Sequence, residues 1–520
     1  MVRFEKYILL LLLGAAVTAP AQVVHRLTTD RFSLYRIDDW ISYGPSLHIT
    51  SVDIDNDYIY FGTRNGGILR FDKYENKWDY PYTTSSGLRS NFILRIVYSF
   101  NDGYLYAQTP AGVDVYKPAE KFWRPAETAF MPQPRRPKEE DINTIQKGKD
   151  YRFPPYFRPP NSFLPDFFTP VSFLYQSPDR LYDQQNREFH FTDRITDTWQ
   201  RVWFGTDGFG PLEGDLYSVR LERRLHGLPD LSPRDIYIDG DSIWIGGIRT
   251  SSSVAGITHW DRKRDTWTYF GAPFISQLYR DDVTAVDGNQ NYIVFATMYG
   301  LSVYDLKRDK WYAVTSMNGL EGDHVLDVVV DHSFAYVASE NGFNYVDLTT
   351  KRVFEMSETI LDNVRINQLA LEDSILWAAT RFGLYKIDIF KDRIFFTQSQ
   401  ASVVDYDIQT VGVSGSEIWF AGEYGISFWN RETGDWRSFP ALEFKAVYRD
   451  IAFTKNCVWF ATNQGLLKYD RKKEYWRLYT ERDGLISNDV FNIDQQKSRL
   501  LLTTGAGVTS FRWHRKDRID

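Results

Sequence analysis

Cysteine, methionine and histidine are scarce in this chain. Its 520 residues include one cysteine, five methionines and eight histidines. A single cysteine excludes an internal disulfide. Because Cys457 lies in an apolar run with only Lys455 as a basic neighbour, we expect a buried, unreactive thiol. The histidines are scattered singly without metal-ligand spacing, so we predict no metal site and no cofactor.

Charge of one sign and long hydrophobic runs are also lacking. The formal net charge is −7, and acids and bases are interspersed without a basic stripe, so nucleic acid is not an expected partner. The apolar run 8–17 is too short to span a bilayer. Arg3 and Lys6 precede this run and Ala19-Pro20-Ala21 follows it, which is typical of a signal peptide covering residues 1–21. We predict a periplasmic or extracellular mature chain without a transmembrane segment.

Catalytic motifs are missing as well. The sequence contains no His-Glu-x-x-His, Gly-x-Ser-x-Gly or phosphate-loop pattern. The calcium-like string 53–57 has Tyr58 where the loop glycine is needed and Arg64 in place of the bidentate glutamate, so it is interpreted as a turn between strands.

Paired carboxylates could still hydrolyse a glycan. The candidate acids recur, however, as Arg-Asp before inner strands, and a group that repeats around a ring is expected to serve the blade. We therefore predict that the chain is not an enzyme, with a polysaccharide-active enzyme as the last alternative. The repeated pairs are Arg234-Asp235, Arg280-Asp281 and Arg449-Asp450.

Aromatic residues are abundant and follow a repeat. The chain has 16 Trp, 33 Tyr and 36 Phe, residues favoured on half-buried strands. An aromatic or aliphatic residue, a glycine six positions later and a large apolar residue four positions after that recur with a period of roughly forty residues. Clean copies begin at Tyr106, Val294, Tyr336, Trp377, Trp419, Trp459 and Leu501, copies with turn insertions begin at Tyr60 and Trp244, and an irregular tenth copy surrounds Trp203.

Each copy predicts four strands. Continuous apolar runs such as 458–461 fit a strand buried on both faces. The repeat glycine lies where a tight hairpin needs a positive φ, and an Asp or Asn after the next strand can cap the following turn. Four strands in about forty residues make one propeller blade. The sequence therefore predicts an all-β protein, a β-propeller of four-stranded blades over residues 22–520 with about ten units.

The two ends of the repeat complement each other. The last copy ends at Phe511-Arg512-Trp513 without an outer strand, whereas residues 39–43 match an outer strand that has no blade before it. We expect residues around 36–43 to complete the last blade and remove an exposed sheet edge. A single ring is favoured. Two smaller rings, or a unit near residue 200 that is not a blade, are the alternatives.

The connections before the inner strands resemble a known family. Segments 86–91, 226–229, 318–323 and 483–488 share a Gly-Leu pair, and residues 459–470 follow the pattern Trp-Phe-Ala-Thr-x-x-Gly-Leu-x-x-Tyr-Asp. Together they resemble the two-component regulator propeller repeat over nearly all of the mature chain. That resemblance implies a periplasmic sensing region, often glycan-recognising, or an accessory protein of an outer-membrane-associated secretion system. After Trp513 there is no room for a β-sandwich, transmembrane helix or kinase, so signal transduction by this chain itself is not expected.

A proline-rich insertion, predicted over residues 124–190, interrupts the repeat. Segments 131–137 and 151–160 hold proline at a density that excludes ladder strands and helix, so extended structure is expected. The second segment is too rich in Tyr and Phe for a free linker. It is interpreted as an ordered strap over the ring or, alternatively, as a loop that docks a partner.

Candidate binding residues lie in the turns just before the repeat glycines. The surrounding positions repeat whereas these vary, as expected of function placed on loops over a rigid frame. We expect the turns to gather around the central opening and to bind a glycan, peptide or envelope protein; an assembly or secretion scaffold is the alternative. The candidates are Arg64, Asn65, Tyr299, Glu340, Asn341, Arg381, Phe382, Glu423, Tyr424, Asn463 and Gln464.

Overall fold

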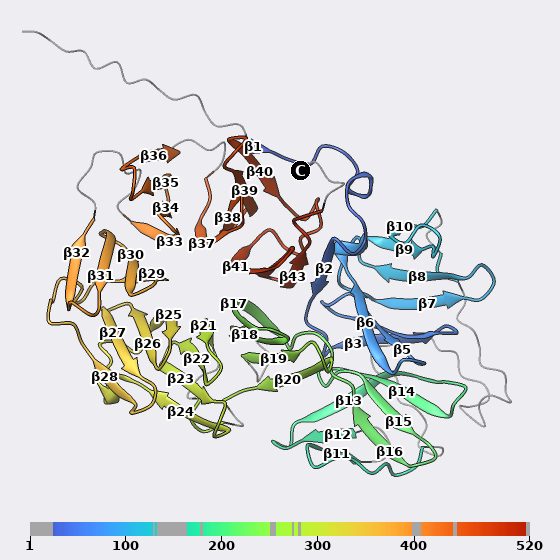
Figure 1. Ribbon diagram of the computed structural model, residues 1–520. Helices are drawn as coiled ribbons and strands as arrows, with labels where there is room; N and C mark the ends of the chain where they lie inside the picture. Colours follow the sequence, from blue (N-terminus) through green and yellow to red (C-terminus); the bar gives the residue numbers. More distant parts are fainter. Residues whose placement is uncertain are drawn as a thin grey trace, which may run out of the picture.

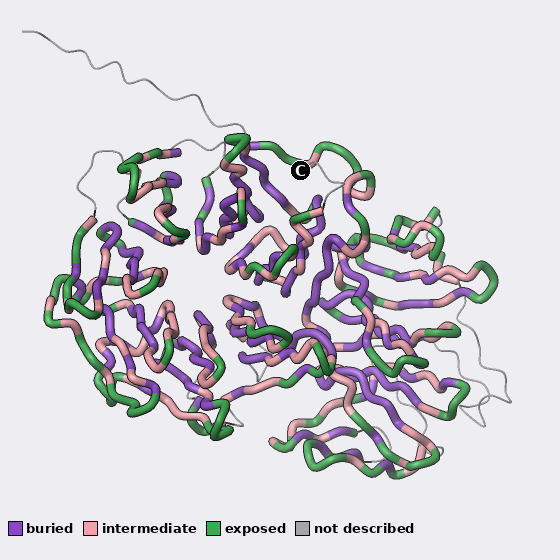
Figure 2. Tube along the Cα trace, in the orientation of Figure 1, coloured by how far each residue is buried: buried purple, intermediate pink, exposed green. Residues whose placement is uncertain are grey.

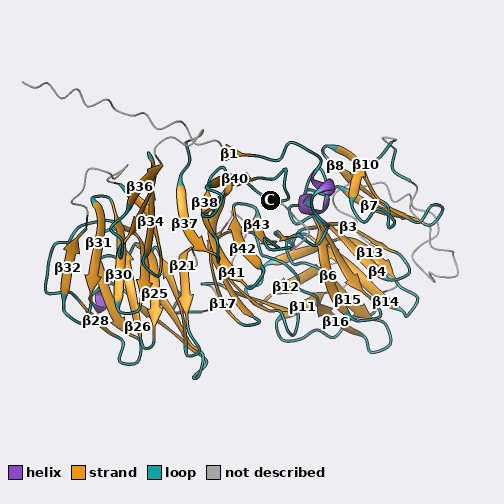
Figure 3. Ribbon diagram, turned by 45° about the horizontal axis from the view of Figure 1, so that its top comes forward, coloured by secondary structure: helices purple, strands orange, loops and turns teal. Residues whose placement is uncertain are grey.

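The computed structural model describes residues 24–127, 130–132, 164–176, 180–249, 256–272, 275–278, 282–397, 407–439 and 445–515. The predicted signal peptide 1–21, the proline-rich residues 133–160 and the pair Arg280-Asp281 lie outside these ranges. The described chain forms ten sheets, in which the pairing of neighbouring strands is almost entirely antiparallel. Figure 3 shows strands throughout, with helix confined to short turns. These 3-10 turns are η1 (Arg31–Ser33), η2 (Thr84–Ser86) and η3 (Ser316–Asn318).

Seven sheets belong to one closed group, which we call the propeller ring. Six of them follow the chain order, and the seventh borrows its outer strand from the N-terminal segment. The ring sheets are β17 (Leu231–Asp239), β18 (Ser242–Arg249), β19 (Ile257–Asp261) and β20 (Thr266–Phe270); β21 (Val283–Gly288), β22 (Tyr292–Thr297), β23 (Gly300–Asp305) and β24 (Lys310–Val314); β25 (Val325–Asp331), β26 (Phe334–Ser339), β27 (Phe343–Asp347) and β28 (Arg352–Phe354); β29 (Ile366–Glu372), β30 (Ile375–Thr380), β31 (Gly383–Asp388) and β32 (Arg393–Phe396); β33 (Ile408–Ser414), β34 (Glu417–Gly422), β35 (Gly425–Asn430) and β36 (Trp436–Phe439); β37 (Tyr448–Phe453), β38 (Cys457–Thr462), β39 (Gly465–Asp470) and β40 (Tyr475–Tyr479); and β41 (Val490–Gln496), β42 (Arg499–Thr504), β43 (Gly507–Phe511) and β2 (Trp40–Tyr43).

The other three sheets form what we call the three-sheet stack. Its largest sheet has six strands and contains the irregular repeat unit around Trp203. The stack comprises β3 (Ile49–Ile54), β4 (Tyr58–Thr63), β5 (Ile68–Asp72) and β6 (Lys77–Tyr82); β7 (Arg95–Ser99), β8 (Tyr104–Thr109), β9 (Gly112–Tyr116) and β10 (Trp123–Pro125); and β11 (Phe173–Gln176), β12 (Arg180–Asp183), β13 (Glu188–Thr196), β14 (Arg201–Thr206), β15 (Leu212–Asp215) and β16 (Arg220–Arg223).

The ring closes with seven sheets rather than ten. The innermost strands β17, β21, β25, β29, β33, β37 and β41 contact one another in this order, and β17 contacts β41. In the stack, β3 lies between β13 and β7. Figure 1 shows the ring at the left and the stack at the right. The preferred expectation of a single ring of ten blades is therefore wrong, because the fourth sheet along the chain packs against the last sheet and leaves the first three outside the circle.

The N-terminal segment closes the ring as predicted. Strand β2 pairs antiparallel with β43, and the indole of Trp40 stacks on the Phe511 ring at 3.8 Å between centroids. An apolar cluster buries this sheet against the β17–β20 sheet, with Ile41, Val508 and Ile236 among its members. Upstream, β1 (Val24–His25) adds to the edge of β40 as a parallel fifth strand.

The region predicted as an insertion contains strands at both of its ends. Strand β10 reaches Pro125, and β11, β12 and the start of β13 occupy residues 173–190. The side chain of Phe167 is buried and packs edge-on against Phe204 at 6.2 Å between centroids. The predicted boundary at residue 190 is therefore too late, because the repeat irregularity around Trp203 hid two additional strands of the same sheet.

The turn chemistry follows the repeat. Among the repeat glycines, Gly465 has φ +134° and a Cβ there would lie 2.2 Å from the Tyr479 carbonyl oxygen, which explains why this position is glycine. The Asp470 carboxylate accepts the backbone N–H groups of Lys472 and Lys473, as predicted for the residue after the third strand. Asp55 does the same for Asp57, which confirms the inter-strand turn.

Side chains on the innermost strands join each sheet to the next. The Asp235 carboxylate accepts the Val286 N–H of the following sheet at 2.7 Å, and Asp450 accepts that of Ile493 at 2.8 Å. The expectation that the repeated Arg-Asp acids serve the blade is thereby confirmed at both positions. The same type of bond links Asp193 to Val52, Asp53 to Tyr98, Asp287 to Val330, Asp327 to Leu369 and Gln368 to Val411.

Apolar residues fill the space between neighbouring sheets. One cluster combines Val294 and Val303 of one ring sheet with Val325 and Val337 of the next. Figure 2 shows buried residues along the middle strands and exposed residues at the outer turns. Cys457 lies in such a layer, and burial raises the pKa of its thiol, in agreement with an unreactive side chain. No blade can bury both faces alone, so the sheets stabilise one another.

Candidate functional site

Nine of the predicted binding residues lie on the propeller ring and two do not. Arg64 and Asn65 belong to the turn between β4 and β5 of the three-sheet stack, so they do not share the ring's central face. The nine on the ring occupy the turns between the second and third strands of five ring sheets. They are Tyr299, Glu340, Asn341, Arg381, Phe382, Glu423, Tyr424, Asn463 and Gln464.

The ring turns lie beside the segments that lead into the innermost strands. The Glu340 carboxylate contacts His324 Nδ1 at 3.0 Å and Arg365 Nη1 at 3.1 Å, and both residues directly precede innermost strands. The Asn463 side chain accepts the Val447 N–H at 2.9 Å. Exposed aromatic side chains, Tyr299, Phe382 and Tyr424, alternate with these charged and amide groups. The ring turns therefore present a mixed aromatic and polar surface.

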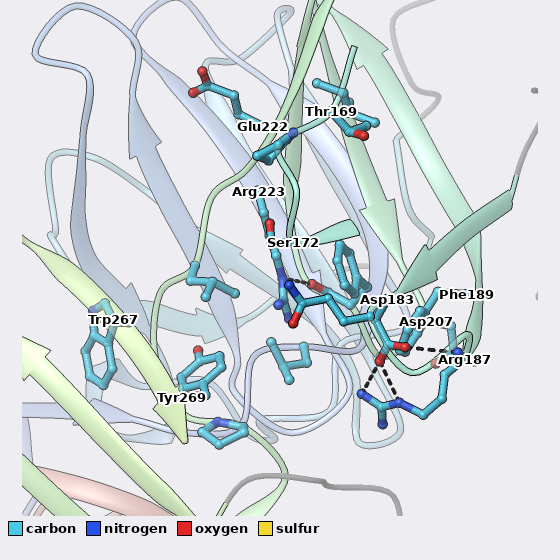
Figure 4. Close-up of a pocket in the computed structure, with 18 of the residues that line it drawn as sticks. Thr169, Ser172, Asp183, Arg187, Phe189, Asp207, Glu222, Arg223, Trp267 and Tyr269 are labelled. Carbon is cyan, nitrogen blue, oxygen red and sulfur yellow. Dashed lines mark hydrogen bonds and ion pairs between the residues drawn. The ribbon is translucent and has the colours of Figure 1, made fainter. Parts of the chain in front are cut away.

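A large hollow lies instead where the stack meets the ring. This junction cleft has a volume of about 1090 Å³. One wall consists of the β11–β16 sheet with the segment 168–172, and the opposite wall includes Trp267 and Tyr269 of β20 (Figure 4). Leu47 and His48, which connect β2 to β3, complete the lining together with Leu225, Pro229 and Asp230, which lie before β17. Sites at the boundary between two rigid units are common places for ligands.

An imidazole holds three segments together at one wall of the cleft. His48 contacts the Asp207 carboxylate through Nδ1 and the Asp230 carboxylate through Nε2, the latter at 2.7 Å. These two hydrogen bonds raise the pKa of His48 to about 9, and the bond from His48 lowers the pKa of Asp207. The imidazole is therefore cationic at neutral pH and joins the stack, through Asp207, to the segment before β17, through Asp230.

A second histidine lies nearby in an apolar environment. His226 stacks on the indole of Trp78 from the stack at 5.0 Å between centroids and meets Trp267 of the ring edge-on at 5.7 Å. Burial lowers the pKa of His226 to about 3, so this imidazole is neutral. The backbone N–H of Trp78 donates to the Asp265 carboxylate at 3.2 Å, which adds a polar link across the same junction. These contacts fix the two units against each other beneath the cleft.

The floor of the cleft combines aromatic faces with an arginine. The Arg223 guanidinium lies over the Phe209 ring, 3.9 Å from its centroid, and its Nε donates to the Phe209 carbonyl at 2.7 Å. Phe189 packs against Phe209 at 5.0 Å between centroids. Figure 4 shows Arg223 extending between Tyr269 on one side and the Asp183–Arg187 pair on the other. In that pair, Arg187 Nε donates to Asp183 at 2.6 Å.

The charged groups of the cleft are committed to one another in a way that disfavours acid–base chemistry. Both nitrogens of His48 engage carboxylates, so neither is available to take a proton from a ligand. Asp183 is held by Arg187, and Asp207 also accepts from Arg64 at 3.1 Å. Within the described ranges, no group of three or more His, Cys, Asp or Glu residues is arranged to hold a metal ion. The arrangement suits recognition by aromatic contact and hydrogen bonding.

Removing the His48 imidazole should weaken the junction. We expect His48→Ala to cost about 3 to 5 kcal/mol of stability, because it removes the cation that pairs with the buried Asp230 carboxylate. The measurement is the urea midpoint, combined with hydrogen exchange over residues 225–230. His332→Ala is the control, since that side chain is 88% exposed. Equal midpoints for the two variants would show that His48 does not join the units.

Sequence reasoning missed this cleft. Of the two histidines at this junction, His226 is a buried core residue, whereas His48 binds two carboxylates at the wall of the cleft. The available signal was the aromatic end of the proline-rich tract, where Phe167 is buried and the exposed Phe168 lines the cleft. The described chain has no helix long and apolar enough to cross a bilayer.

No family model matches this chain, and no curated protein matches its sequence. Among solved structures, it is similar to the extracellular domain of BT4673 from B. thetaiotaomicron, with 12% identity, a TM-score of 0.43, and coverage of 91% of this chain and 71% of that one. It is also similar to PorZ, a surface component of the type-IX secretion system of Porphyromonas gingivalis, with 13% identity, a TM-score of 0.48, and coverage of 89% and 74%. A third structure, YCF48 bound to D1 peptide, has 14% identity, a TM-score of 0.44, and coverage of 55% and 94%.

Proposed function

We propose that this protein is an exported, non-catalytic binding protein of the two-component regulator propeller type, and that its ligand binds in the junction cleft. The observation that carries the proposal is a cleft of about 1090 Å³ between two fixed units, lined by aromatic faces and by charges that are already oriented. Pre-formed, mostly apolar hollows with a few fixed polar groups are the usual form of ligand sites. The predicted signal peptide supports a periplasmic or extracellular location.

The fixed geometry also favours binding over turnover. The His48, Asp207 and Asp230 side chains are joined to one another, and His226 is enclosed by aromatic rings. Fixed groups lose little conformational entropy when a ligand arrives. The aromatic side chains of the ring-face turns are exposed, so we place these turns second, as a surface for an envelope protein if the chain serves as an assembly scaffold.

Exposed aromatic residues allow the two surfaces to be separated experimentally. Phe168 lines the cleft with 73% of its surface exposed, whereas Tyr424 on the ring face is 59% exposed. We expect Phe168→Ala to weaken binding about fivefold in a screen of glycan arrays and displayed peptides, because one aromatic contact is worth about 1 kcal/mol. Because both side chains are exposed, neither Phe168→Ala nor Tyr424→Ala should alter the melting temperature.

Tyr424→Ala and Tyr299→Ala are the matched controls and should leave cleft binding unchanged. Loss of binding in the two tyrosine variants with full binding by Phe168→Ala would transfer the function to the ring face. Turnover of any glycan by the wild-type protein would contradict a non-catalytic role.

A further inference from the structure

The edge of β16 in the junction cleft has unused backbone hydrogen-bonding groups. The Leu221 N–H points away from β15, because it donates to the Phe168 carbonyl at 3.0 Å. Residues of a strand alternate in direction, so the carbonyl of Leu221 and the backbone groups of Arg223 point the same way, towards the cleft. Consistently, the N–H of the next residue, Arg224, points to the β15 side of the strand and donates to the Pro211 carbonyl at 2.9 Å. Both Leu221 and Arg223 line the cleft.

The chain itself begins a strand along this edge and then leaves it. Phe168 pairs in parallel with Arg220, and its N–H donates to the Val219 carbonyl at 2.8 Å. A continuing parallel strand would next offer an N–H from residue 170 to the Leu221 carbonyl. Residue 170 is proline, which has no N–H, and its carbonyl instead accepts the Phe173 N–H in a turn. Within the described residues, the Leu221 carbonyl and the Arg223 N–H therefore remain without a backbone partner.

Another edge of the same protein accepts an extended segment. Strand β1 adds to β40 in parallel, with Val24 opposite Trp476 and His25 opposite Arg477. Sheets with free edges bind extended peptides in this way, and the side-chain pockets beside the edge supply specificity. Beside β16, those pockets are lined by Phe189, Phe209 and Tyr269.

The charge of the edge indicates what such a peptide carries. The Arg223 side chain makes its one hydrogen bond to a neutral carbonyl, and no carboxylate of the described residues forms an ion pair with it. Burial lowers the pKa of this guanidinium to about 10, still well above neutrality, so the cation is desolvated and retained. A carboxylate is the group that best satisfies a desolvated guanidinium, through two parallel hydrogen bonds.

We propose that the junction cleft binds an extended peptide as an added strand along β16, with a carboxylate of that peptide paired to Arg223. The proposal rests on the proposed binding function and adds the ligand class. The peptide's main chain bonds to the Leu221 carbonyl and the Arg223 N–H, and its apolar side chains enter the aromatic part of the cleft. The carboxylate comes from an acidic side chain or from the peptide's C-terminus.

The test uses a library of random twelve-residue peptides displayed against the full mature protein. Enriched sequences should carry Asp or Glu at a fixed position or end at a free C-terminus, and amidation of synthetic versions distinguishes these two sources. Arg223→Gln should weaken binding by about tenfold to a hundredfold, since it removes a hydrogen bond to a charged group. Arg223→Lys should recover part of the affinity. N-methylation at alternate peptide positions should abolish binding, whereas methylation at the positions between them should not.

Other outcomes overturn the peptide proposal. Enriched peptides that tolerate N-methylation at every position, or that bind Arg223→Gln as well as wild type, contradict strand addition at β16. Binding that requires deletion of residues 133–160 would assign the edge to the chain itself. A glycan that binds in a Phe168-dependent manner, with no enriched peptide, overturns the peptide proposal while leaving the proposed function intact. Absence of both peptide and glycan binding overturns both.

Discussion

Trp40→Ala is expected to destabilise the closing sheet by about 3 to 5 kcal/mol, the range observed when a fully buried aromatic residue is truncated. Trp40 is only 2% exposed and stacks on Phe511, with Tyr479 and Tyr35 around it. Its removal leaves a cavity at the point where the N-terminal strand joins the last sheet. The measurement is the denaturation midpoint followed by near-ultraviolet circular dichroism, together with hydrogen exchange in β2, β43 and β17.

Trp199→Ala is the matched control for this effect. Trp199 is 40% exposed in the turn before β14, outside the ring, so its truncation should cost about 1 kcal/mol or less. A Trp40→Ala protein as stable as Trp199→Ala, with unchanged exchange in β17, would show that the N-terminal strand does not hold the ring closed.

Stability should decrease between pH 5 and pH 8, the second large effect. Burial between neighbouring sheets of the ring and of the stack raises the pKa of Asp53, Asp327 and Asp494 to about 7, and that of Asp193 and Asp287 to about 6. An unfolded carboxyl titrates near 3.9. Between about pH 4 and 7 the folded chain therefore holds protons that the unfolded chain has released, and its stability falls as pH rises.

The histidines modify this trend without reversing it. The pKa of His226 is lowered to about 3, so as pH falls below about 6.5 the unfolded chain binds a proton that the folded chain does not. The stabilisation from this group is then lost, and below about pH 6.5 it opposes the effect of the carboxylates. The pKa of His48 is raised to about 9, and its contribution is lost as pH rises through that value. The urea midpoint should accordingly be higher at pH 5 than at pH 8.

Asp53→Asn provides the control for the pH effect. The Asp53 carboxylate accepts the Tyr98 N–H at 2.6 Å, and an amide in its place keeps one acceptor oxygen but cannot titrate. The variant should lose more stability relative to wild type at pH 5 than at pH 8. A constant difference across this range, or a wild-type midpoint that rises with pH, would contradict the assignment of raised pKa values to the inner carboxylates.

Local features of the fold could be predicted from the sequence because each is encoded by neighbouring residues. Gly465, Asp470 and the orphan outer strand at Trp40 all carry their signal within a few positions. The number of sheets in the ring could not be predicted in this way. It depends on whether β17 packs on the last sheet, where the Thr503 hydroxyl of β42 donates to the Arg234 carbonyl at 3.0 Å. No repeat pattern specifies that long-range contact.

The candidate site shows the same division. Sequence comparison within the repeat singled out variable turns, and it correctly assigned Asp235 and Asp450 to the blades. The junction cleft could not be found from spacing, because His48, Asp207 and Asp230 come from separate parts of the chain and meet only once the stack has docked on the ring. The open edge of β16 likewise depends on Pro170, whose effect is visible only beside its neighbouring strand.

Closure of the ring at seven sheets is tested most directly by linking β17 to β41. The Arg234 guanidinium lies 3.7 Å from the centroid of the Phe491 ring, across the closing seam. In a Cys457→Ser background, Arg234→Cys and Phe491→Cys should be joined within one chain by a short thiol-reactive linker, as identified by mass spectrometry. Ser42→Cys with Thr509→Cys is the positive control, since the two wild-type hydroxyl oxygens are 2.8 Å apart. Efficient linkage in both pairs is predicted, whereas linkage of the control pair alone would contradict the seven-sheet ring.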